Sequence, residues 1–148
     1  MVIESLALIF ERDLKKLIQE LELYKNEENI WRIDKNISNS TGNLSLHLMG
    51  NLNSFIGAEL GKTSYVRNRP LEFSEKNVPR EKLIHQIENT IVDVKNSLSK
   101  LSEVELDHDY PLLVFAEKMS VGYFLVHLTT HLAYHLGQIN YHRRLIDE

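Results

Sequence analysis

Four of the seven histidines in this 148-residue chain fall within one stretch near its C-terminal end. His127, His131 and His135 recur at every fourth position there. On an α-helix four residues turn the chain by about 400°, so the three imidazoles stack along one face. Imidazole is the commonest protein ligand of zinc and related metals. The spacing therefore indicates a metal-binding helix, and the alternative is a metal-free helix whose imidazoles are exposed or hydrogen-bonded.

Helical angles separate these histidines. With His127 placed at zero, the apolar side chains of the stretch cluster between roughly 100° and 180°, whereas His131 falls near 40° and His135 near 80°. His131 and His135 are thus the inward pair, and His127 lies at the edge of the buried arc. Buried imidazoles need partners, and a metal ion would satisfy both together.

The pair has the i, i+4 spacing of zinc-protease helices, but Leu132 replaces the glutamate that follows the first histidine there. The protease motif and its base are therefore absent, and a third ligand has to come from another helix. His47 lies at the margin of the buried face of an earlier amphipathic segment. A site of His47, His131 and His135 would leave at least one coordination position open, as Lewis-acid catalysis requires.

Four amphipathic segments with three- and four-residue apolar spacing must position these side chains. They are predicted to run from Ile3 to about Asn26, from about Asn43 to Leu60, from about Arg80 to Leu101, and from an N-cap at Ser120 to Ile146. Residues 62–79 and 102–119 are predicted to be irregular connectors. No strand alternation persists, so we expect a single all-α domain over residues 1–148, a four-helix bundle with long crossover connections.

Composition narrows the function. Hydrophobic residues make up 43% and charged residues 26% of the chain, which is typical of a globular domain. The net charge of −4 gives no basic surface for nucleic acid. The first residues lack a basic start followed by an apolar run, and no long apolar run occurs later, so we expect no signal peptide and a cytoplasmic protein without a membrane partner. The absence of cysteine means that any metal is held by nitrogen and oxygen, and any thiol comes from outside.

The run His131-x-x-x-His135-Leu136-Gly137-Gln138-Ile139 resembles the terminal-helix motif of the DinB/YfiT-like superfamily. His47, within Leu46-His47-Leu48-Met49-Gly50-Asn51-Leu52, resembles the second-helix histidine of that family. Residues 67–73 are similar to an uncharacterised bacterial DinB-like subgroup. The resemblance implies a four-helix bundle with a long crossover, often a homodimer. It also implies a divalent metal, zinc or nickel, on His47, His131 and His135.

Characterised members of that superfamily include metal-dependent thiol transferases, a mycothiol-dependent maleylpyruvate isomerase and an amide-hydrolase-like protein. The first hypothesis is therefore a metal-dependent enzyme acting on a small molecule. It would be a transferase using a low-molecular-weight thiol as co-substrate, or a hydrolase. The second is a non-catalytic, metal-stabilised dimeric bundle of the stress-response type. In that case a fourth protein ligand, His127 or a carboxylate, would close the site.

The supporting residues are less well defined by the sequence. No Asp or Glu is evident beside the three histidines, so the candidate for a catalytic proton-transfer group is His127. Arg67 and Arg69 could hold an anionic group of a substrate, or be solvated. Gln138 could hydrogen-bond a ligand, or pack structurally.

Overall fold

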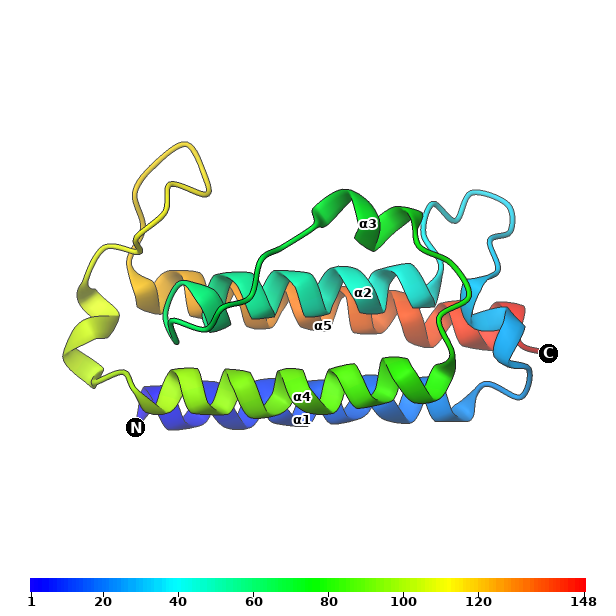
Figure 1. The fold of residues 1–148 in the computed structure, drawn as a ribbon, viewed down its shortest axis with the longest axis horizontal. Coiled ribbons are helices and arrows are strands. Elements are labelled where there is room, and N and C mark those ends of the chain that lie inside the picture. The colour runs from blue at the N-terminus through cyan, green and yellow to red at the C-terminus, as the bar shows by residue number, and fades with distance from the viewer.

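Four long helices form a bundle in the computed structural model, which describes residues 1–148 (Figure 1). They are α1 (Val2–Leu23), α2 (Thr41–Leu52), α4 (Arg80–Ser99) and α5 (Val121–Ile146). A π-helical segment, η2 (Asn53–Ala58), extends α2 by more than a turn. The chain has no β-strand, and the predicted all-α fold is confirmed.

Helices α1 and α2 occupy opposite corners of the bundle, because each packs against both α4 and α5. Helices α1 and α5 run in one direction along the bundle, and α2 and α4 run in the other (Figure 1). The chain therefore has to travel back along the bundle between the end of α2 and the start of α4. That return is the predicted long crossover. The arrangement makes α2 and α5 antiparallel neighbours.

The core is built from the apolar stripes that the sequence shows. On α1, Phe10, Leu14, Leu17 and Leu21 follow one another at three- and four-residue spacing, and none of them is exposed. Burying one such side chain contributes about 1.5–3 kcal/mol relative to leaving it in water. Truncating Leu14 to alanine would cost about 2–5 kcal/mol, because the surrounding helices cannot fully close the cavity.

Two helix ends differ from the sequence prediction. Helix α1 ends at Leu23 rather than near Asn26, because Tyr24 takes an extended backbone conformation (φ −62°, ψ 123°). Helix α2 begins at Thr41, inside the Ser- and Asn-rich run that looks like a loop, because the Ser40 hydroxyl accepts the Asn43 N–H. The start of α5 is confirmed, since the Ser120 side chain caps it by accepting the Tyr123 N–H.

The crossover is not irregular throughout, so that prediction was wrong for part of it. Residues Arg69–Ser74 form a short helix, α3, that lies along α2 (Figure 1). The Asn68 side chain accepts the Leu71 N–H at its start, and Pro70 occupies its first turn. Short 3₁₀ helices, η1 (Glu27–Trp31) and η3 (Glu103–Asp107), interrupt the other connectors. No helix in the chain is long and apolar enough to cross a bilayer.

Candidate metal centre

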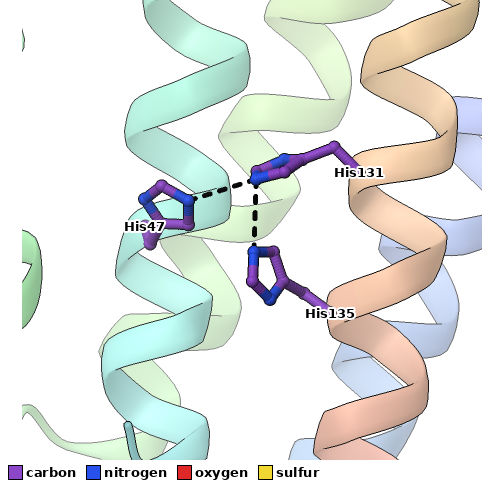
Figure 2. A group of neighbouring side chains, drawn as sticks. All are labelled: His47, His131 and His135. Carbon is purple, nitrogen blue, oxygen red and sulfur yellow. Dashed lines mark hydrogen bonds between the residues drawn. The ribbon is translucent and has the colours of Figure 1, made fainter. Parts of the chain in front are cut away.

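Three imidazoles meet between α2 and α5 (Figure 2). His47 projects from α2, and His131 and His135 project from successive turns of α5. The Nε2 atom of His131 lies 3.2 Å from Nε2 of His47 and 3.2 Å from Nε2 of His135. The ligand atoms of the three side chains all lie within 4.8 Å of one another. The structure thus brings together the three histidines that the sequence singled out.

The surroundings keep these rings in the form that binds metal. His47 is buried, and His131 and His135 are half-buried. Burial, together with the smaller effect of the neighbouring histidines, lowers the pKa of His131 to about 4. Burial also lowers the pKa of His47, against the opposing effect of Glu72. Neutral imidazole is the ligand form, so His47 and His131 do not have to lose a proton at neutral pH to bind an ion.

His47 is oriented by a buried carboxylate. Oε1 of Glu72 lies 3.1 Å from Nδ1 of His47. Because an ionised carboxylate only accepts hydrogen bonds, Nδ1 carries the proton and Nε2 presents its lone pair to the other histidines. Arg67 donates from Nε to Oε2 of Glu72 at 2.8 Å and from Nη2 to Oε1 at 3.0 Å. The Arg67 Nη2 atom also lies 3.5 Å from His47 Nδ1, but both groups are donors in this arrangement.

Glu72 corrects the sequence analysis, which found no carboxylate beside the histidines. It lies 25 residues from His47 and arrives on α3, the helix that the sequence did not reveal. Its approach requires a glycine one turn along α2. A Cβ atom at Gly50 would lie 1.8 Å from Oε2 of Glu72. Gly50 at position i+3 from His47 was the available sequence signal, because a glycine in a buried helix face marks a close approach.

His135 is oriented within its own helix. Its Nδ1 lies 2.8 Å from Oε1 of Gln138, one turn further along α5. An amide oxygen accepts, so Nδ1 of His135 carries the proton and its Nε2 is also a free lone pair. Gln138 thus contacts a metal-site histidine, a role that neither reading of the sequence included. His131 differs, because its Nδ1 is buried and has no hydrogen-bond partner.

The donor set fits a divalent cation. The partners of His47 and His135 turn two Nε2 lone pairs toward Nε2 of His131, which has at most one proton to donate. A hydrogen bond from His131 can therefore satisfy only one of these two lone pairs. A cation would satisfy all three nitrogens. Nitrogen ligands on a tetrahedral zinc at 2.0–2.1 Å are about 3.3 Å apart. The two Nε2–Nε2 distances that His131 makes, 3.2 Å each, are close to this value.

Other predicted site residues lie outside this cluster. His127 is not in the group of ligand atoms, and its ring packs 5.0 Å from Phe115 and 5.9 Å from Phe124 between centroids. Arg67 is engaged by Glu72 and also lies over the Phe55 ring. Arg69 is exposed at the start of α3. No cysteine, carboxylate or fourth histidine joins the group, so it offers three ligand atoms.

Fold and site together define a class, a crossover four-helix bundle with a three-histidine cluster between two antiparallel helices. The chain belongs to a family described as "Protein of unknown function (DUF1572)", whose sequence profile matches residues 5–148. No curated protein matches the chain. The family assignment therefore spans nearly the whole domain but assigns no reaction to it.

Proposed function

We propose that this protein is a metal-dependent enzyme of the DinB/YfiT type, with zinc or nickel held by His47, His131 and His135. One observation carries the proposal: three Nε2 atoms converge, and two of them are held in the lone-pair tautomer by Glu72 and Gln138. In metal sites, a hydrogen bond from the ring nitrogen that does not bind the metal fixes the tautomer and the orientation of a histidine ligand. Without a metal, at least one of the two fixed lone pairs would have no hydrogen-bond donor.

The chain's own residues would act mainly by binding and orientation. The bound cation would supply Lewis-acid polarisation of a substrate atom. Glu72 holds the His47 proton on Nδ1, and Arg67 holds the Glu72 carboxylate in place. Because both Glu72 oxygens are engaged, Glu72 orients His47 rather than moving a proton to substrate. A proton-transfer group is not supplied by the cluster, and His127 stays the candidate.

Two reaction classes remain within the proposal. One is transfer to or from a low-molecular-weight thiol, and the other is hydrolysis of a small molecule. The chain has no cysteine, so a thiol reaction would need a free thiol as co-substrate. Incubation of zinc- or nickel-loaded protein with bacillithiol, mycothiol or glutathione and an electrophile would separate them. Turnover that needs the thiol supports transfer, and turnover in water alone supports hydrolysis.

The second candidate function is a non-catalytic, metal-stabilised bundle. It requires a fourth protein ligand to close the site. The cluster holds three ligand residues and His127 is outside it, which favours the open site. X-ray absorption on the loaded protein would count the ligands. Four protein ligands would overturn the enzyme proposal, and three with a light solvent atom would support it.

The primary test is elemental analysis of protein purified without a histidine tag. We expect about one zinc or nickel ion per chain in the wild type and almost none in His131→Ala. The matched control is His85→Ala, because His85 is exposed on α4 and lies outside the cluster. Wild-type protein that remains metal-free after incubation with either ion would overturn the proposal. Equal loss in both variants would show a folding effect instead.

We also propose that the protein forms a homodimer through the start of α5 and the connector before it. Leu113, Phe115, Tyr123 and Val126 are exposed there by 66%, 45%, 63% and 49%. Large apolar side chains grouped at a surface are typical of a protein interface. Analytical ultracentrifugation should give a dimer for the wild type and a monomer for Leu113→Glu. A monomeric wild type would contradict this part of the proposal.

A further inference from the structure

A cavity of about 520 Å³ begins at the metal cluster and runs along the C-terminal half of α5. Its walls include His135 and the Gln138 that orients it. Tyr134 and Tyr141 stand along one wall, and the segment before α2, residues 36–39, forms the other. Four further cavities, of about 320 to 560 Å³, contain none of the three cluster histidines in their walls.

Other side chains cover the cluster on two further sides. Toward the start of α5, the rings of Phe115 and Phe124 pack on His127, which stacks 6.4 Å from His131 between centroids. Toward α3, the Glu72–Arg67 ion pair covers His47. The His135 end is therefore the side from which a molecule of some size would reach an ion held by the cluster.

The walls of this cavity carry no Asp, Glu, Lys or Arg. Charged residues make up 26% of the chain, and each of the four further cavities described above has at least one charged residue in its wall. His142, at the base of the cavity, accepts from the Tyr24 hydroxyl and donates to the Arg32 carbonyl. Burial lowers the pKa of His142, so it is neutral at pH 7.

The uncharged walls still offer hydrogen bonds and flat surfaces. Asn36, Asn39 and Gln138 supply amide donors and acceptors. The rings of Tyr134 and Tyr141 are 65% and 63% exposed, so their faces are available for stacking. Arg144 lies over the Tyr141 ring, 5.2 Å from its centroid, but is not part of the wall.

We propose that this cavity is the substrate site and that it selects neutral molecules with a flat or aromatic part and an amide or hydroxyl group. The inference rests on the proposed metal-dependent function and adds the class of substrate. Against these walls an ionised group would lose its hydration without gaining an opposite charge, which is unfavourable. An ion held by the histidines would attract an anion only at the His135 end. A charged thiol co-substrate does not match this uncharged lining. In a thiol-transfer reaction, the cavity would therefore hold the neutral molecule that reacts with the thiol.

Three probes of one shape test the selection: benzamide, benzoate and benzamidine, which are neutral, anionic and cationic. Ligand-observed NMR with metal-free protein would measure their affinities for the cavity, because a bound zinc ion would attract benzoate independently of the walls. We expect benzamide to bind at least about tenfold more tightly than either charged probe. Equal or tighter binding of benzoate or benzamidine, or no binding of benzamide, would overturn the inference.

A charge placed in the wall supplies the positional control. Asn36→Asp should weaken the binding of benzamide and strengthen the binding of benzamidine, and it should leave the zinc content of the protein unchanged. Asn89→Asp, at an exposed position in the wall of the cavity between α2 and α4, should leave the order of affinities unchanged. Identical behaviour of the two variants would overturn the location. If the protein selects benzamide but takes up no zinc, the metal proposal is wrong and the cavity inference is supported. If the protein takes up zinc but does not select benzamide, the cavity inference is wrong and the metal proposal stands.

Discussion

Oε1 of Glu72 lies 3.1 Å from Nδ1 of His47, and the same carboxylate is held by two hydrogen bonds from Arg67. The three side chains come from different parts of the chain: α2, the crossover and α3. Their contact links the crossover to the histidine cluster. The crossover helix therefore has a defined task, which is to fix the tautomer and the orientation of His47.

Replacing this carboxylate should weaken metal binding without unfolding the bundle. Glu72→Gln keeps the shape of the side chain but removes the charge that favours a proton on Nδ1 of His47. We expect the dissociation constant for zinc to rise about 10- to 100-fold, measured by competition with a chromophoric chelator. Glu75→Gln is the control, since Glu75 follows the same short helix and makes no contact with His47. Equal affinities for Glu72→Gln and wild type would contradict the assigned role.

A methyl group at Gly50 should also weaken zinc binding, although Gly50 makes no side-chain hydrogen bond to Glu72 or His47. Gly50→Ala places a Cβ atom 1.8 Å from the present position of Glu72 Oε2, so the carboxylate has to move. We expect a loss of about 1–3 kcal/mol in unfolding free energy and weaker zinc binding. Gly137→Ala on α5 is the matched control, because an added Cβ there meets nothing within 4 Å. Zinc affinity should drop only in the first variant, and an unchanged affinity there would contradict the prediction.

Asn51 should support His131 once a metal is bound. Asn51 lies one turn after His47 on α2 and is 7% exposed, and its Oδ1 has no partner. Nδ1 of His131 is also buried and unpaired, and it carries the proton when Nε2 binds metal. We expect Asn51→Leu to weaken zinc binding about tenfold, and Asn51→Asp, which keeps an acceptor, to retain most of the affinity. Isothermal titration would compare them, and equal losses would refute the pairing.

Acid should destabilise the metal-free protein in a defined pH range. Burial lowers the pKa values of His47, His131 and His142 in the folded state. The unfolded chain therefore takes up protons first, and stability present above pH 6.5 is lost as the pH falls. For His131 the loss extends to about pH 4. The melting temperature should be nearly constant from pH 8 to 7 and fall below 6.5.

His142→Gln isolates one part of that pH dependence. Glutamine does not titrate, so the melting temperature of this variant should fall less steeply below pH 6.5 than that of the wild type. His108→Gln serves as the control, because His108 is exposed. Parallel curves for wild type and His142→Gln would show that His142 does not contribute to the acid sensitivity.

The sequence by itself determined the four helices and singled out the three histidines of the cluster. Both depend on local periodicity, because a 3.6-residue repeat places apolar residues and histidines on definite helix faces. That is why the cap at Ser120 and the inward pair His131 and His135 were predictable. His47 could be named because it was the one other histidine near a buried helix face.

Only the tertiary structure decided how those histidines are held. Glu72 reaches His47 across 25 residues, and no local repeat encodes that distance. It required a short helix inside a crossover and a glycine under the carboxylate. The tautomers of His47 and His135, the unpaired nitrogen of His131 and the uncharged cavity beside them are properties of packing. They follow from which surfaces meet, whereas periodicity specifies only which face of each helix is buried.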